Sequence, residues 1–159
     1  MLILLPPSEG KNQPARAKAL KLSALSFAEQ LTEARAKTLQ KYPSVYQSKC
    51  DVTAQVYSGV LYQSLDFESL SPAAKKRAEK SILIISAAFG ALRLNDVIPY
   101  YKFKIDAKVW KAPLAQALEG IDTQLVIDAR SSTYATVWTP EPTSTVAIRV
   151  FTKVKGQKK

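Results

Sequence analysis

The stretch Ser81-Ile82-Leu83-Ile84-Ile85-Ser86 decides the fold, because its four central residues are consecutive and apolar. Such an unbroken run, directly after a segment with helical features, indicates a strand that is buried on both faces, as in the parallel sheets of α/β domains. Similar runs occur at residues 2–5, where Pro6 ends the run, and at residues 125–128. We therefore predict an α/β fold with a central mixed, largely parallel sheet flanked by helices, and with residues 2–5 as a central strand.

Three helices are expected in the N-terminal half of the chain. Ser26 followed by Glu29 forms a capping-box pattern, which predicts a helix from Ser26 to about Lys41. A helical pattern of apolar residues predicts a second helix over residues 52–65, and Ser71-Pro72 is typical of the start of a third. The last two helices form a helix-hairpin-helix candidate, although most helical hairpins only pack against a core.

Two further elements are expected in the C-terminal half. Residues 113–118 are typical of a helix that precedes the strand at residues 125–128. Residues 145–155 place apolar side chains at alternating positions, which predicts a half-exposed strand. The chain of 159 residues has the size of one domain, so we expect a single domain over residues 1–159.

Several classes of protein do not fit this composition. Cys50 is the only cysteine and histidine is absent, so we expect neither a disulfide, nor a zinc site, nor a nucleophile activated by histidine. The longest apolar runs are much shorter than the ~20 residues of a membrane-spanning helix, and Met1 is not followed by a signal peptide. We expect a cytoplasmic protein without a membrane anchor, a metal or a cofactor.

The formal net charge of +10 and the pI near 9.7 favour an anionic partner. Nucleic acid, whether DNA or RNA, is the leading candidate. A small phosphate-containing ligand is a second possibility. The plainest alternative is a basic surface that only faces solvent.

Polar residues gather where three predicted strands end, and ligands of open α/β sheets bind outside the carboxyl ends of the strands. The first segment, Pro6-Pro7-Ser8-Glu9-Gly10-Lys11, lacks the first glycine and the final Ser or Thr of a Walker phosphate loop, so that interpretation is rejected. Ser8 and Lys11 also have Ser-x-x-Lys spacing, which could make Ser8 a nucleophile, but in this chain the spacing is more easily explained by chance.

The other two strand ends carry arginines. Arg93, Lys102 and Arg130 could form a cluster that binds phosphate oxygens. Alternatively, Arg93 pairs with Asp96, and Arg130 pairs with Asp128, to close loops. Several tyrosines could stack on bases, although most buried tyrosines are core residues with a bonded hydroxyl. They are Tyr57, Tyr62, Tyr100, Tyr101 and Tyr134.

Four motifs follow one another along the chain. They are Pro6-Pro7-Ser8-Glu9-Gly10-Lys11, Val56-Tyr57-Ser58-Gly59-Val60-Leu61-Tyr62, Ser86-Ala87-Ala88-Phe89-Gly90-Ala91-Leu92-Arg93-Leu94-Asn95-Asp96-Val97-Ile98-Pro99-Tyr100-Tyr101 and Asp128-Ala129-Arg130-Ser131-Ser132-Thr133-Tyr134. In this order they resemble the peroxide stress protein YaaA family. The chain departs from the family pattern between Ala107 and Trp110 and after Lys159, and we expect a loop and a C-terminal region to be missing there.

The resemblance implies an α/β fold with a positively charged cleft, a helix-hairpin-helix element, binding of double-stranded or structured DNA, and a role in limiting iron-driven damage during peroxide stress. By position, the hairpin would span residues 58–80, with Lys75, Lys76 and Arg77 on its second helix. The resemblance also implies which residues line the cleft. They are Ser8, Lys11, Tyr57, Arg93, Tyr101, Lys102, Asp128, Arg130, Ser131 and Tyr134.

Three hypotheses follow. The first is a DNA-binding stress protein, in which the hairpin contacts phosphates, and Arg93 and Arg130 hold the backbone or a flipped nucleotide. The second is an enzyme acting on a nucleotide or nucleic acid, with Ser8 and Lys11 as further candidates, Asp128 as general base and Arg93 as anion stabiliser. The third is an interaction protein whose basic face binds an acidic partner.

Overall fold

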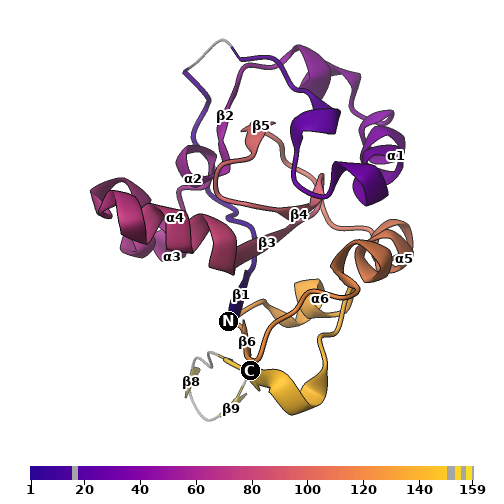
Figure 1. The fold of residues 1–159 in the computed structure, drawn as a ribbon. Coiled ribbons are helices and arrows are strands. Elements are labelled where there is room, and N and C mark those ends of the chain that lie inside the picture. The colour runs from indigo at the N-terminus through magenta and orange to yellow at the C-terminus, as the bar shows by residue number, and fades with distance from the viewer. Residues whose placement is uncertain (16–17, 150–152, 155–156, 159) are drawn as a thin grey trace.

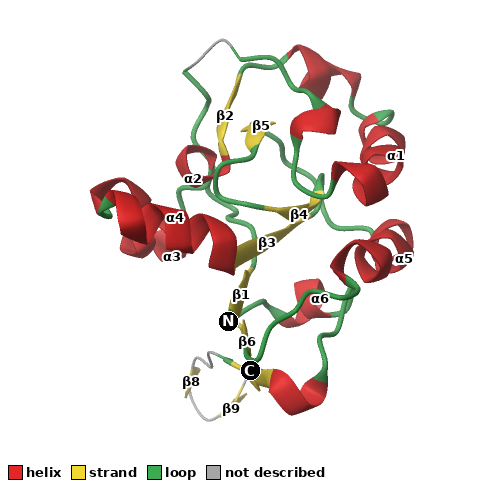
Figure 2. Cartoon of the chain, in the orientation of Figure 1, coloured by secondary structure: helices red, strands yellow, loops and turns green. Residues whose placement is uncertain are grey.

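The structure is a computed structural model, and it describes residues 1–15, 18–149, 153–154 and 157–158. Figure 1 shows a central sheet with helices on both sides, and Figure 2 shows the same arrangement by type of secondary structure. The sheet contains, in spatial order, β4 (Gly90–Leu92), β3 (Ile82–Ser86), β1 (Leu2–Leu5), β6 (Val126–Asp128) and β7 (Thr145–Ala147).

The pairing of these strands makes the sheet mixed and largely parallel. β1 lies in the centre and pairs in parallel with both β3 and β6, and β6 pairs in parallel with β7. Only the β3–β4 pair of this sheet is antiparallel. The predicted fold class and the central position of residues 2–5 are therefore confirmed.

Each face of the sheet is covered by its own hydrophobic cluster. Successive residues of a strand point to opposite faces, so Leu4 belongs to one cluster and Leu5 to the other. On the first face lie α1 (Ala28–Leu39) and α5 (Ala107–Leu118), which pack against each other and bury Leu31 and Trp110.

The second face is covered by shorter elements. Three helices lie there, α2 (Thr53–Val56), α3 (Val60–Leu65) and α4 (Pro72–Ser81), beside a two-stranded ladder of β2 (Cys50–Val52) and β5 (Val97–Pro99). The remaining elements are the short helix α6 (Ser132–Ala135), the pair β8 (Lys153–Val154) and β9 (Gln157–Lys158), and 3-10 turns at Leu22–Ala24, Pro43–Gln47, Phe67–Ser69 and Pro142–Ser144.

The predicted capping box at Ser26 is wrong. The N-cap of α1 is Phe27, which has a left-handed backbone with φ of 59°. Ser26 instead donates to the buried carboxylate of Asp96 through both its backbone N–H and its hydroxyl, at 2.8 and 3.0 Å. A long-range partner therefore replaces the local cap.

Two other helix predictions need correction. Residues 52–65 do not form one helix, because residues 57–59 are extended between α2 and α3. The helix expected at residues 113–118 begins at Ala107, with the Asp106 side chain accepting from the N–H of Lys108, and it contains Pro113 in its interior. Trp110, three residues before Pro113, is fully buried in the cluster on this face of the sheet.

Two expectations are decided only in part. The strand expected over residues 145–155 is shorter, with β7 at Thr145–Ala147, and residues 150–152 and 155–156 lie outside the described residues. α3 and α4 follow one another with a 3-10 turn between them, but this arrangement does not confirm a DNA-binding helix-hairpin-helix. Within the described parts of the chain, no helix is long and apolar enough to cross a membrane.

Candidate functional site

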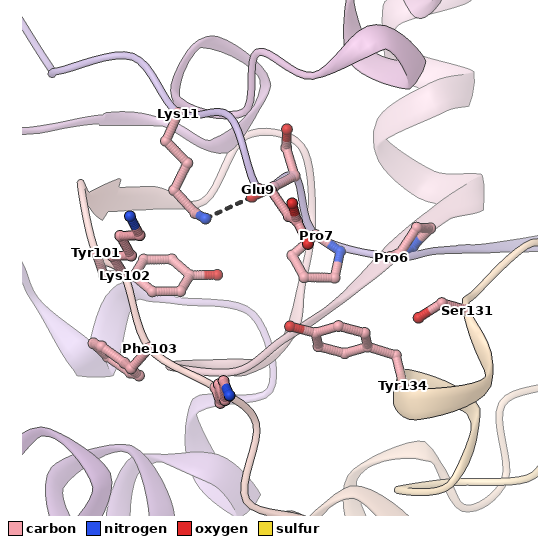
Figure 3. A pocket seen from close by; sticks show the side chains of 11 residues that line it. Pro6, Pro7, Glu9, Lys11, Tyr101, Lys102, Phe103, Ser131 and Tyr134 are labelled. Carbon is pink, nitrogen blue, oxygen red and sulfur yellow. Dashed lines mark hydrogen bonds between the residues drawn. The ribbon is translucent and has the colours of Figure 1, made fainter.

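A cleft of about 620 Å³ lies where β1 and β6 end, with the segment after β5 forming another wall. The carboxyl ends of adjacent parallel strands are the usual place for ligands in open α/β sheets. Figure 3 shows how the side chains from these segments surround a shared space. The cleft is lined by Pro6, Pro7, Ser8, Glu9, Lys11, Tyr101, Lys102, Phe103, Lys104, Ser131 and Tyr134.

The loop after β1 is held by the segment between α2 and α3. The N–H of Gly59 donates to the Ser8 hydroxyl at 2.7 Å, and the Tyr62 hydroxyl donates to the Pro6 carbonyl at 2.7 Å. Lys11 and Tyr57 form an isolated antiparallel bridge. These contacts fix the loop by both its backbone and its side chains, and they place the Lys11 side chain over the cleft.

Lys11 presents a positive charge against aromatic rings. Its Nζ donates to the Ser8 carbonyl at 2.5 Å and lies 4.6 Å from the ring centroid of Tyr101. Burial lowers the pKa of Lys11, while the negative charge of Glu9 raises it and the positive charge of Lys102 lowers it. The group is therefore partly desolvated, which strengthens any contact that it makes with an anion.

A chain of buried hydroxyl groups lies behind Lys11. The hydroxyl of Tyr101 is 2.6 Å from that of Tyr57 and 2.8 Å from that of Ser86. The Ser86 oxygen also accepts from the N–H groups of Ala88 and Phe89 at 3.2 and 3.1 Å. Burial raises the pKa of both tyrosines, so both hydroxyls keep their protons at neutral pH.

Asp128, at the end of β6, is occupied by Arg130. The guanidinium of Arg130 donates to both carboxylate oxygens of Asp128 at 2.9 Å, and the backbone N–H of Arg130 adds a third hydrogen bond at 3.0 Å. Burial would raise the pKa of Asp128, but the hydrogen bonds and the charge of Arg130 lower it overall. A carboxylate with a lowered pKa and both oxygens engaged is a poor general base.

The comparisons with known proteins agree on one family. A family model described as "Peroxide stress protein YaaA" matches residues 1–159. The chain belongs to the YaaA family. Membership supports a role in peroxide stress.

The chain is also similar to several individual proteins. It is 34% identical to the UPF0246 protein SCO2297 of Streptomyces coelicolor, over 89% of this chain and 68% of that protein. It is 33% identical to the UPF0246 protein CE1889 of Corynebacterium efficiens, over 84% of this chain and 68% of that protein. A match to the protein Cj0984 of Campylobacter jejuni is 33% identical and covers 54% of this chain and 39% of that protein.

The structure brings together some of the residues that the YaaA resemblance implies. Ser8, Lys11, Tyr101, Lys102, Ser131 and Tyr134 all line the cleft. Tyr57 does not line it but supports Tyr101 from the core. The Ser8 hydroxyl accepts the hydrogen bond of Gly59, so it acts as a fixed point of the loop in this structure.

Arg93 lies away from these residues. Its guanidinium donates to the carbonyls of Lys80 and Ile82, at the start of β3, whereas the Ser86 end of β3 faces the cleft region. Four residues of a strand separate positions by about 13 Å. Arg93 therefore does not join Lys102 in a cluster. The expected pair with Asp96 is made by the backbone N–H of Arg93, which donates to the Asp96 carboxylate at 2.7 Å, and not by its side chain. Arg130 is likewise buried in its pair with Asp128.

The basic residues of α4 lie on another surface. Lys75 pairs with Glu68 at 3.3 Å, and its Nζ is 5.6 Å from the centroid of the Phe67 ring. Lys76 and Arg77 are exposed. None of these three lysine or arginine side chains lines the cleft.

Five residues that line the cleft are absent from the set that the YaaA resemblance implies, namely Pro6, Pro7, Glu9, Phe103 and Lys104. A signal was present in the sequence, because Tyr101-Lys102-Phe103-Lys104 alternates aromatic and basic side chains. That alternation is typical of surfaces that bind nucleic acid. Among the described residues, no group of three Asp, Glu or Cys side chains is placed to hold a metal ion.

Proposed function

We propose that this protein acts in peroxide stress by binding DNA in the cleft. The observation that supports this proposal is the placement of three lysines, Lys11, Lys102 and Lys104, around one space that also contains aromatic rings. Lysines supply the sequence-independent attraction for phosphates, and aromatic faces supply stacking for bases. The net charge of +10 adds a long-range attraction for the polyanion.

The contacts differ from those of the first hypothesis. Arg93 and Arg130 bond to groups of the protein itself, so the cleft lysines take over their expected role as phosphate donors. The exposed Lys76 and Arg77 of α4 would provide a second, outer contact with the same DNA. Such phosphate contacts position a protein on DNA without reading its sequence.

DNA binding also offers a physical route to protection during peroxide stress. Protein cations that neutralise phosphates release the counterions held there. We propose that the bound protein excludes iron ions in the same way from the phosphates that it covers. Damage driven by iron would then fall along the covered DNA.

The test is fluorescence anisotropy of labelled duplex DNA with the protein and two charge-matched variants. Lys102→Glu with Lys104→Glu changes the cleft, and Lys21→Glu with Lys49→Glu makes the same charge change at exposed residues outside it. We expect the cleft variant to lose at least about tenfold in affinity and the control to lose much less. The slope of affinity against salt should also be smaller for the cleft variant, by about 0.9 for each lost phosphate contact.

Three results would reject the proposal. The first is affinity that does not change with salt, because phosphate binding requires such a change. The second is an equal loss in both variants, which would assign binding to net charge alone. The third is binding of an acidic protein but not of DNA, which would favour an interaction protein.

A second candidate function is an enzyme that acts on a nucleotide in the same cleft. The partial burial of the Lys11 amine favours this candidate, because desolvation is one way to activate a lysine. Asp128 would not serve as its base, since both of its oxygens are bonded to Arg130. Incubation with nucleotides and DNA, followed by analysis of products with the Lys11→Met variant as control, tests this candidate.

A further inference from the structure

We propose that the floor of the cleft is a subsite for the phosphate of a single nucleotide, held by the Tyr101 hydroxyl and the Lys11 ammonium group. The inference rests on the proposed function, because it concerns the same cleft. It goes further by naming the two donors and a ligand that can bind without duplex DNA. The protons of the buried hydroxyl chain decide which group donates into the cleft.

The three hydroxyls of this chain carry three protons, and short hydrogen bonds of 2.6 and 2.8 Å join Tyr101 to Tyr57 and to Ser86. Ser86 has two lone pairs, and these accept the N–H groups of Ala88 and Phe89. Its own proton must therefore be donated to Tyr101. One more proton joins Tyr57 and Tyr101, and the third proton finds no free lone pair on Ser86, which already accepts from two N–H groups.

The position of the two tyrosines decides where the third proton points. If Tyr101 donated to Tyr57, the proton of Tyr57 would be left with Ser86 as its neighbour. The Ser86 oxygen already accepts from two N–H groups, and a poorly satisfied buried donor is costly. If Tyr57 donates to Tyr101, the proton of Tyr101 is available to the cleft. Tyr101 lines the cleft and Tyr57 does not, so the second arrangement is favoured. Tyr101 is then a neutral donor that is positioned by two buried partners.

Lys11 supplies the charge beside this donor. Its ammonium group has three N–H donors, and the Ser8 carbonyl accepts from one of them. The amine lies 4.6 Å from the centroid of the Tyr101 ring, so both groups can reach one ligand. An ammonium group and a hydroxyl that donate to the same small region match the oxygens of a phosphate better than those of a neutral ligand.

The rest of the cleft fits the other parts of a nucleotide. The volume of about 620 Å³ exceeds what inorganic phosphate needs and lies within the range of small-molecule sites. Phe103 and Tyr134 offer aromatic surface for a base, and the Tyr134 hydroxyl points toward that of Tyr101 across the cleft (Figure 3). The exposed carboxylate of Glu9 can accept from a sugar hydroxyl or a base amine.

The nucleotide could be free, or it could be the phosphorylated end of a DNA strand. Isothermal titration calorimetry with thymidine monophosphate, thymidine and inorganic phosphate tests the subsite. A second pair of probes, a single-stranded oligonucleotide with and without a 5′-phosphate, distinguishes the two sources. We expect thymidine monophosphate to bind at least about tenfold more tightly than thymidine, because only the former engages both donors.

Three variants that replace a tyrosine by phenylalanine separate the binding role of Tyr101 from a structural one. Tyr101→Phe should weaken binding of thymidine monophosphate by about tenfold or more, since a hydrogen bond to a charged group is lost. Tyr57→Phe should change it by less than about threefold, because Ser86 still donates to Tyr101. The neighbouring Tyr100→Phe is the matched control, and Lys11→Met should abolish the preference for the phosphate. Circular dichroism and thermal unfolding show that each variant is folded.

The proposal is overturned if thymidine binds as tightly as its monophosphate, or if Tyr101→Phe and Tyr57→Phe have equal effects on binding. A phosphate-dependent gain seen only with the oligonucleotide supports the subsite and assigns it to DNA ends. Duplex binding without any phosphate-dependent binding of the small probes or strand ends refutes the subsite alone. Binding of thymidine monophosphate without duplex binding refutes the proposed function and leaves the subsite intact.

Discussion

The N–H of Gly59 donates to the hydroxyl of Ser8 at 2.7 Å, and this bond joins segments 51 residues apart in the sequence. The contact is so close that a Cβ atom on Gly59 would lie 2.4 Å from the Ser8 oxygen. Ser8 belongs to the loop that carries Lys11 into the cleft. The geometry of the cleft therefore depends on a position where a side chain does not fit.

Substitution Gly59→Ala is expected to destabilise the protein by about 1–3 kcal/mol, the usual range for overpacking. It should also weaken DNA binding, because the displaced loop carries Lys11. Adding Ser8→Ala removes the clashing oxygen and leaves only the Ser8 Cβ, at 3.6 Å. Urea unfolding of both single variants and the double variant measures the coupling. If the double variant is no more stable than Gly59→Ala, the clash is not the cause.

Substitution Gly90→Ala is expected to cost about 3 kcal/mol or more. Gly90 has φ of 68°, and an added Cβ would lie 2.6 Å from a ring atom of the fully buried Trp110, so left-handed strain and overpacking add up. Gly120→Ala is the matched control, since Gly120 has φ of 72° but nothing within 4 Å of its Cβ position. The control should lose only about 1–2 kcal/mol. If both variants lose the same free energy of unfolding in urea, the clash with Trp110 does not contribute to the loss in Gly90→Ala.

Substitution Asp128→Asn should cost about 3–5 kcal/mol, because it leaves the buried guanidinium of Arg130 without its charged partner. Glu68→Gln breaks the more exposed pair with Lys75, and this change should cost less than about 1 kcal/mol. Urea unfolding measures the free energy of unfolding of each variant, and the two losses relative to the parent are then compared. An Asp128→Asn variant as stable as the parent would mean that the ion pair is not needed for the fold.

The same pair predicts a pH dependence of stability. The pKa of Asp128 is lowered in the folded protein below its unfolded value of about 4. Its stabilisation is therefore fully present above about pH 4 and is lost as the pH falls through the lower folded pKa. Urea unfolding at pH 5 and at pH 2.5 should show a larger loss of stability in the parent than in Asp128→Asn. The same loss in both proteins would contradict this assignment.

The sheet could be predicted from the sequence because its strands are unbroken apolar runs. Leu2–Leu5 and Ile82–Ser86 are both buried on two faces, and such runs have few alternatives to a parallel strand. The helix boundaries were less predictable, because tertiary contacts override local signals. Ser26 bonds to Asp96 and does not form the predicted cap, and the helix that contains the buried Trp110 continues through Pro113.

The site was predictable where it follows from the position of strand ends. The loop at residues 6–11 and the segment after residues 125–128 both line the cleft as expected, through Lys11, Ser131 and Tyr134. Lys102 follows β5, a strand that the sequence patterns did not predict. The pairing of Arg130 with Asp128 was one of the two alternatives left open, and the structure decides for it. The partners of Arg93 were not predicted, because sequence does not show whether a guanidinium faces solvent or a buried acceptor. Arg130 faces Asp128, and Arg93 faces backbone carbonyls at the other end of β3.

The most direct test of DNA binding in the cleft is lysine modification read by mass spectrometry, with and without duplex DNA. The proposal predicts that DNA protects Lys102 and Lys104, both exposed at the cleft, while Lys21, Lys49 and Lys111 react as before. Protection confined to Lys76 and Lys80 of α4, with Lys102 and Lys104 still reactive, would contradict the proposal.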